Sequence, residues 1–222
     1  MIEVKNDKLE ISFPEVHRKA KASVSFLKTL RVPDDNKSYP SPDGLGEIQL
    51  RYFEDYQKQM NASDAKRGGV ILPMYQSEVI WINFDGDYPI AIKIATGKVN
   101  AITGLPLENV LIDDPQDYMV IPEQPWLDGY KVSEQEVRQF VATRLVQGES
   151  AEEQITGSAE FGGLQLIAIP MRADVYHRMF EKKIVKCHMN VCFEQSEPPF
   201  MGFMAGGKIN QTIEEDPYGI GV

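Results

Sequence analysis

The chain has 222 residues, of which 42% are hydrophobic and 25% are charged, so it is long and apolar enough to bury a core. Its 33 acidic residues against 23 basic ones give a formal net charge of −10, which argues against nucleic acid and anionic membranes as partners. No apolar run reaches the roughly 20 residues that span a bilayer, and the polar N-terminus lacks the features of a secretory signal, so we expect a soluble, cytoplasmic protein.

Strand patterns dominate the N-terminal quarter. We expect strands at 11–13, 23–32 and 48–53, with a loop rich in turn-forming residues at 33–46. The polar segment 54–69 fits either a short helix or a surface loop.

The segments 69–75 and 78–84 are nearly continuous in apolar residues, which predicts strands that are buried on both faces. A tight turn at 85–87 leads into the next strand, where three isoleucines between 90 and 94 share one face and Lys93 lies on the other. This alternation predicts a half-buried strand, and together these segments predict the clearest hairpin in the chain.

A loop rich in Pro and Asp at 105–117 precedes a strand at 118–122 and a Trp-containing motif. Further segments follow at 138–146, 152–157 and 162–171, then a helix at 174–185, a strand at 185–194 and a polar C-terminal segment. About ten short strands and at most two helices predict a mainly β fold, a sandwich or distorted barrel with one or two short peripheral helices. We expect residues 1–222 to form one β-rich domain.

The stretch 202–208 has the spacing GxxxxGK of a phosphate-binding loop. However, Ile209 follows where magnesium binding needs Ser or Thr, and Ile209, Gln211 and Ile213 alternate as in a strand. We therefore expect a glycine-rich turn and strand, and no nucleotide cofactor.

Cys187, His188 and Cys192 are close in sequence, but a strand would turn Cys187 away from the other two. We therefore expect two reduced cysteines in the core and a histidine at the surface, and not a metal site.

Acidic turns at 34–36, 85–87 and 113–117 supply hard oxygen ligands for calcium or magnesium, with Asp85 and Asp87 as the candidates. Because turns also favour Asp and Asn for local hydrogen bonds, the main expectation is that no metal or other cofactor binds, with calcium or magnesium as the alternative.

The motif at 124–129 places Trp126 beside Pro125 and an Asp-Gly pair, where a loop is expected. Aromatic loop residues on a β scaffold often contact ligands or partners, so Gln124, Trp126 and Asp128 are the candidate binding residues. The alternative is a Trp folded back to cover one end of the scaffold.

Several stretches in chain order resemble an uncharacterised family of microbial proteins: TLRVPDD (29–35), LPMYQSEVIWINF (72–84), KIATGKVNAITG (93–104), QPWLDGY (124–130), VRQFVATRLVQG (137–148), EEQITGSAEFGGLQL (152–166) and GGKINQTIEEDPYGI (206–220). The resemblance implies no activity, cofactor or site residue. The relatives continue past the position of Val222, which makes the N-terminal part of a longer protein an alternative description of the domain.

As function, the sequence favours a non-catalytic binding or assembly module that uses loops at one end of a β scaffold. Its partner would be a protein, a small ligand or a second copy of the chain. The alternative is a hydrolase that uses acidic residues, with a divalent cation held at Asp85 and Asp87.

Overall fold

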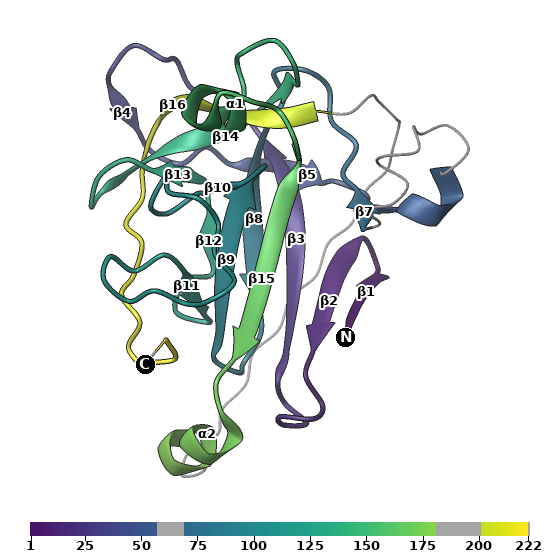
Figure 1. The fold of residues 1–222 in the computed structure, drawn as a ribbon, viewed down its shortest axis with the longest axis vertical. Coiled ribbons are helices and arrows are strands. Elements are labelled where there is room, and N and C mark those ends of the chain that lie inside the picture. The colour runs from purple at the N-terminus through teal and green to yellow at the C-terminus, as the bar shows by residue number, and fades with distance from the viewer. Residues whose placement is uncertain (57–68, 181–200, 222) are drawn as a thin grey trace.

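The computed structural model describes residues 1–56, 69–180 and 201–221, and it confirms the mainly β fold (Figure 1). A ten-stranded sheet and a four-stranded sheet supply the two sides of the core, and a two-stranded sheet lies apart from both. The sheets do not close into a barrel, so the sandwich is the better of the two expected architectures.

The described residues form sixteen strands. The large sheet contains β1 (Ile2–Lys5), β2 (Lys8–Ser12), β3 (Lys21–Thr29), β4 (Ser38–Tyr39), β5 (Gly44–Glu47), β8 (Val79–Asp85), β12 (Trp126–Leu127), β13 (Gly129–Lys131), β14 (Glu136–Arg144) and β16 (Met201–Asn210). The smaller sheets contain β9 (Ile90–Thr96), β10 (Val99–Asn100), β11 (Met119–Ile121) and β15 (Leu164–Pro170), and β6 (Arg51–Tyr52) with β7 (Val70–Ile71).

The predicted hairpin between 78–84 and 90–96 is wrong. β8 pairs with β3, β12 and β14 in the large sheet, whereas β9 pairs with β10, β11 and β15 in the four-stranded sheet. The short connection between β8 and β9 therefore crosses from one layer to the other. β8 also departs from the expected burial on both faces, because Trp81 and Asn83 are only partly buried and Asp85 is exposed.

The expectation that β9 is half buried is also wrong, because all seven of its residues are buried. The isoleucines at 90, 92 and 94 face the core shared with the large sheet. The opposite face, which includes Ala91, is covered by Leu111, Tyr218 and Ile220 from two irregular segments. The loop between β10 and β11 therefore covers Lys93 and keeps it from water.

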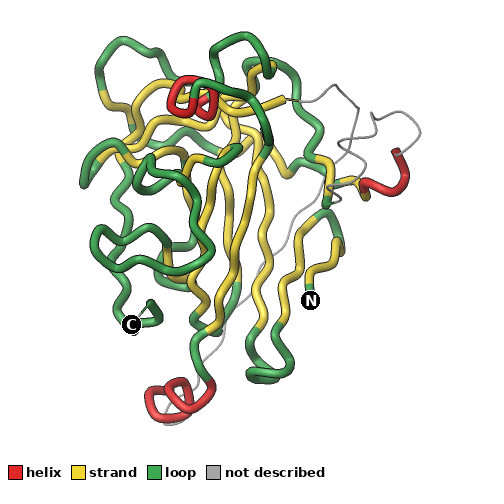
Figure 2. The backbone as a smooth tube through the Cα atoms, viewed as in Figure 1, coloured by secondary structure: helices red, strands yellow, loops and turns green. Residues whose placement is uncertain are grey.

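The glycine-rich turn expected at 202–208 is wrong, because this stretch lies within β16, an extended strand antiparallel to β14 (Figure 2). An extended strand is also not the turn into a helix that a phosphate-binding loop needs. The glycines of β16 allow close approach instead. A Cβ atom added at Gly207 would lie 2.5 Å from the carbonyl oxygen of Pro33, and one added at Gly206 would lie 2.5 Å from Cγ2 of Val141.

Among the described residues, two α-helices lie outside the sheets, α1 (Ala151–Thr156) and α2 (Ala173–Phe180), with a 3₁₀ turn at Phe53–Tyr56. Helix α2 confirms the start of the helix predicted at 174–185, but α1 overlaps the segment 152–157, where we predicted no helix. The strand predicted at 185–194, including Cys187, His188 and Cys192, lies outside the described residues. In the part of the chain that is described, no helix combines the length and apolar character needed to cross a membrane.

Candidate functional site

A pocket of about 890 Å³ opens where the loop after β10 meets the C-terminal segment. Its lining comes from four stretches, within 102–105, 113–118, 131–134 and 213–219. Ligand pockets in proteins measure roughly 300–1,000 Å³. This pocket is therefore large enough for a small ligand or for long side chains of a partner.

The lining of the pocket is strongly acidic. It contains six carboxylates, from Asp113, Asp114, Glu134, Glu214, Glu215 and Asp216. The same lining contributes a single basic residue, Lys131. Like charges gathered around a concave surface reinforce one another, so the pocket concentrates negative potential and attracts cations.

Tyr118 joins two of these carboxylates. Its hydroxyl oxygen lies 2.6 Å from Asp113 Oδ1 and 2.8 Å from Asp216 Oδ2. Burial raises the pKa of the Tyr118 phenol far above its ordinary value of 10.0, and the hydrogen bonds to both carboxylates raise it further, so the phenol keeps its proton. One hydroxyl proton serves only one carboxylate at a time, and the pair is left with unused capacity for another donor.

Asp216 also shapes the C-terminal wall of the pocket. Its Oδ1 accepts the backbone N–H groups of Tyr218 at 2.8 Å and Gly219 at 3.0 Å, and its Oδ2 accepts that of Ile220 at 2.6 Å. A carboxylate bonded to three successive amides in this way fixes a tight turn. The wall is therefore held in shape by its own acidic side chain.

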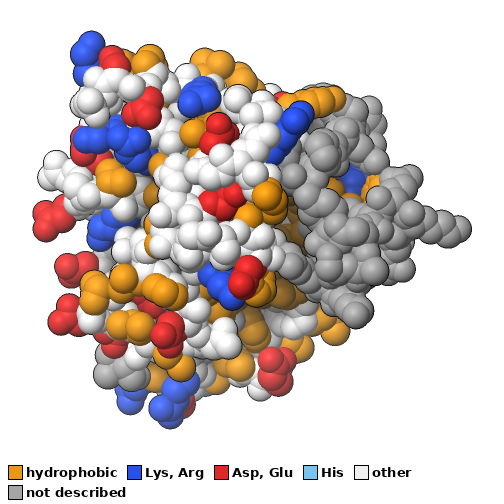
Figure 3. All heavy atoms as spheres, turned by 45° about the horizontal axis from the view of Figure 1, so that its top comes forward, with side chains coloured by type: hydrophobic (Ala, Val, Ile, Leu, Met, Phe, Trp, Pro, Cys, Tyr) orange, Lys and Arg blue, Asp and Glu red, His pale blue; other side chains and the backbone are white. Residues whose placement is uncertain are grey.

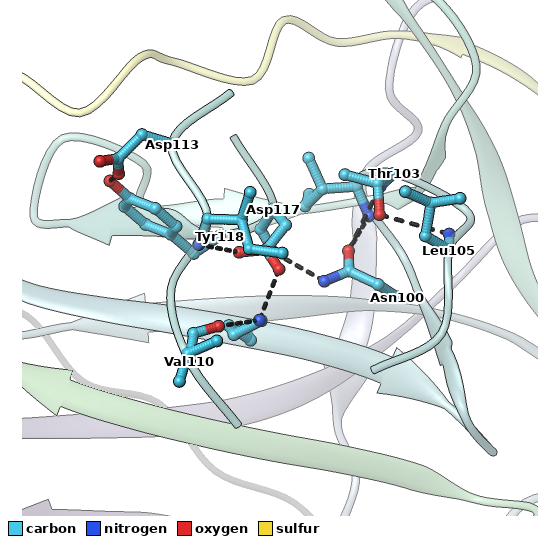
Figure 4. A network of polar contacts seen from close by, with 10 residues as sticks. Asn100, Thr103, Leu105, Val110, Asp113, Asp117 and Tyr118 are labelled. Carbon is cyan, nitrogen blue, oxygen red and sulfur yellow. Dashed lines mark hydrogen bonds and ion pairs between the residues drawn. The ribbon is translucent and has the colours of Figure 1, made fainter. Parts of the chain in front are cut away.

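A buried ion pair holds the opposite wall, the loop between β10 and β11 (Figure 4). Lys93 Nζ lies 2.5 Å from Asp117 Oδ2 and donates to the carbonyl oxygen of Val110 at 2.5 Å. The Lys93 side chain is 0% exposed and that of Asp117 is 6% exposed. Because a buried charge without a partner is costly, this pair fixes the path of the loop over β9.

Asn100 anchors the start of the same loop (Figure 4). Its side-chain nitrogen donates to the carbonyl oxygen of Asp117 at 2.7 Å, and its Oδ1 accepts the N–H groups of Ile102 at 2.8 Å and Thr103 at 3.2 Å. Both ends of the loop are therefore tied to one buried side chain, and the pocket wall is preorganised.

Among the binding residues predicted from sequence, Trp126 is 40% exposed, whereas Gln124 and Asp128 are buried. The structure brings all three together. Gln124 Nε2 donates to the Trp126 carbonyl oxygen at 2.9 Å, and Trp126 Nε1 donates to Asp128 Oδ2 at 3.0 Å. The backbone N–H of Glu214 donates to Gln124 Oε1 at 3.0 Å, which joins the motif to the pocket wall. A contact between Trp126 and a partner stays a prediction.

Asp128 is buried beside neutral partners. Its side chain accepts hydrogen bonds from the Ser41 hydroxyl at 2.8 Å and from the Trp126 indole. Burial raises the pKa of Asp128 above its ordinary value of 3.8, and the two hydrogen bonds offset only part of that effect. The residue therefore stabilises the motif best when it is protonated.

The metal candidates Asp85 and Asp87 are both exposed, at the end of β8 and in the turn after it. Within residues 1–56, 69–180 and 201–221, no group of three or more His, Cys, Asp or Glu side chains is arranged to hold a metal ion.

The pocket itself was missed from the sequence. The acidic turn at 113–117 was noted as a source of ligands, but the Glu-Glu-Asp run at 214–216 was not connected with it. About a hundred positions separate the two runs, and only the antiparallel path of β14 and β16 brings the C-terminal segment back beside the loop. The two short acidic runs were the only feature of the sequence that could have indicated an acidic pocket.

Comparison with family models, curated proteins and solved structures finds no match to this chain. Its function is therefore argued from its geometry.

Proposed function

We propose that the chain is a non-catalytic binding module whose pocket, lined by residues within 102–118, 131–134 and 213–219, takes the cationic groups of a partner. The observation that carries the proposal is the imbalance of six carboxylates and one lysine around a pocket of about 890 Å³. A cation that enters gains from several carboxylates at once in a partly enclosed space, where water screens charges less effectively.

The hydrogen bonds of the pocket favour binding over hydrolysis. Asp113 and Asp216 converge on Tyr118, but Asp216 already accepts three backbone N–H groups. A general acid or base must exchange its proton with substrate, whereas this carboxylate is committed to holding a turn. Its geometry suits a fixed negative charge that attracts a ligand.

The test is titration of the chain with an oligolysine peptide at physiological ionic strength, followed by calorimetry. Asp114, Glu134 and Glu215 are exposed pocket carboxylates for which the described residues provide no side-chain hydrogen bond. The triple variant D114N/E134Q/E215Q removes three charges without breaking the network around Tyr118. We expect it to lose about tenfold or more in affinity, which corresponds to about 1.4 kcal/mol.

The matched control is the triple variant E15Q/D85N/D87N. These three acidic residues are also exposed, and none of them lines the pocket. Both triple variants have the same net charge, so a general attraction between an acidic protein and a basic peptide would weaken equally in both. Equal losses, or no binding by the wild-type chain, would refute the proposal.

The same titration with calcium or magnesium separates a peptide-binding pocket from a cation site. A ligand that binds the folded state raises the melting temperature by mass action. A rise with millimolar calcium that the control variant loses and the pocket variant keeps would instead support a cation at Asp85 and Asp87.

A further inference from the structure

The rim of the acidic pocket carries apolar side chains that are exposed to water. Leu105 is 55% exposed, Val132 is 47% exposed, and both line the pocket. On the same loop as Leu105, Val110 is 60% exposed and Ile112 is 36% exposed. Figure 3 shows hydrophobic and acidic side chains side by side at the lower left of one face of the molecule.

The fold holds Val110 and Ile112 in these positions. Leu111, between them, packs inward against Ala91, Tyr118 and Val120. With the middle side chain partly buried in this way, the two flanking side chains are exposed.

The backbone on either side is fixed as well. Lys93 holds the carbonyl oxygen of Val110, and Asp117 Oδ1 accepts the N–H of Ile112 at 3.0 Å while the backbone N–H of Asp117 donates to the Ile112 carbonyl oxygen at 3.0 Å. The loop cannot turn these side chains inward without breaking a buried ion pair. Leu105 and Val132 line the acidic pocket, and Val110 and Ile112 stand on the loop segment between its lining stretches 102–105 and 113–118. We call these four residues the apolar rim, and the hydrogen bonds of the loop preorganise it.

We infer that the partner is a protein segment that carries lysine or arginine residues alternating with apolar ones. This inference rests on the proposed function and specifies its ligand. The carboxylates of the pocket complement the basic side chains, and Leu105, Val110, Ile112 and Val132 bury the apolar ones. A polyamine has the charge but leaves the rim exposed. An anionic membrane surface is repelled by the six carboxylates.

The experiment compares three probes by calorimetry: spermine, an oligolysine peptide, and a peptide with the same number of lysines interspersed with leucines. We expect the lysine-leucine peptide to bind about tenfold more tightly than oligolysine, because a fixed apolar rim adds burial at little ordering cost. The variant V110S/I112S should remove this gain and leave oligolysine binding unchanged.

The control variant is V146S/I155S, which changes two exposed apolar residues, at 84% and 55% exposure, that lie outside every stretch and loop of the pocket wall. It should bind all three probes as the wild-type chain does. Equal affinities for oligolysine and the lysine-leucine peptide, or an unchanged gain in V110S/I112S, would overturn the inference and leave the proposed function intact.

Failure of the proposed function would give a different result from failure of this inference. If the lysine-leucine peptide bound through Val110 and Ile112 with the same affinity to the wild-type chain and to D114N/E134Q/E215Q, the cationic part of the proposed function would fail. An equal affinity for a leucine peptide with glutamates in place of the lysines would lead to the same conclusion.

Discussion

Among single side chains, Lys93 and Asp117 are those whose replacement we expect to lower the free energy of unfolding most. Both are buried, and each is the charge partner of the other. Removing one member leaves an uncompensated charge in the interior, whereas removing both leaves no charge there and only takes a side-chain partner from the Val110 carbonyl and the Ile112 N–H. The contribution of the pair to stability is therefore tested by comparing a single substitution with the double substitution.

We predict that Lys93→Met lowers the free energy of unfolding by roughly 3–5 kcal/mol, measured by urea denaturation. The double variant K93M/D117L should recover much of this loss. Lys5→Met, which removes a partner of an exposed ion pair with Glu3, should leave the urea midpoint unchanged. A small loss in K93M would show that the pair is not buried as described.

Asp128 gives a prediction about pH. Its pKa is raised in the folded state, so folding favours the protonated form. The stability that it contributes is full below its ordinary pKa of 3.8 and is lost as the pH rises through the raised value. The neutral side chain of Asp128→Asn has no such dependence.

We therefore expect the free energy of unfolding of D128N, relative to the wild-type chain, to increase as the pH rises from about 4 to about 7. Urea denaturation at several pH values measures this difference. Parallel curves for the two proteins would show that Asp128 titrates alike in the folded and unfolded chain.

At the scale of secondary-structure elements, helix α1 is specified by its ends. Ser150 and Glu153 form a capping box, in which each side chain bonds to the backbone N–H of the other. At the C-terminal end Gly157 adopts a left-handed conformation with φ of 78°. A helix of six residues has little propensity to form alone, so these caps and its packing must hold it.

We predict that Ser150→Ala lowers the free energy of unfolding by about 1 kcal/mol and that Ser150→Thr retains most of it, because Thr keeps the hydroxyl that caps the helix and donates to Glu153 Oε2. Thermal unfolding followed by circular dichroism measures both. Equal losses in the two variants would mean that packing of the buried Ser150, rather than its hydrogen bond, stabilises this end of the helix.

At the scale of the whole molecule, the acidic pocket affects stability as well as binding. Six carboxylates that face one pocket repel one another in the folded state. Added salt screens exposed charges, since the Debye length falls from about 10 Å at 0.1 M to about 3 Å at 1 M. The folded chain should therefore be more stable at high ionic strength.

We expect the melting temperature of the wild-type chain to rise with sodium chloride. In D114N/E134Q/E215Q the melting temperature should start higher and rise less. The control E15Q/D85N/D87N should follow the wild-type chain more closely. If both triple variants responded alike, the repulsion would come from the net charge of −10 and not from the pocket.

Alternation along the chain was sufficient to predict the fold class, but it did not predict the strand at 202–208, where a glycine-rich turn was expected. It could not predict β4, β10 and β12, because two residues have no period, and it predicted longer strands at 48–53 and 69–75, where β6 and β7 have two residues each. It also could not show that β8 and β9 lie in different layers, since a hairpin and a crossing between layers have the same pattern of apolar residues.

The motif at 124–129 was singled out as a binding surface, and binding there stays a prediction. The sequence did not indicate that Gln124 and Asp128 are buried, because their partners are distant in sequence: Glu214 for Gln124, and Ser41 and Gln211 for Asp128. The burial of Lys93 was not predicted for the same reason, because the loop that covers it is distant in sequence. A side chain on the outer face of a strand is expected in water unless a loop covers it, and loops with no repeating pattern give no sign of where they lie.

The position of the C-terminal segment has a practical consequence for anyone who purifies the protein. Gly221 sits so close to Asp113 that an added Cβ atom would collide with its Oδ1. A polyhistidine tag fused there would hang beside the carboxylates and, once its imidazoles are protonated, would compete for them as an intramolecular ligand at high local concentration. Affinity measurements should accordingly use protein tagged at the N-terminus or freed of its tag.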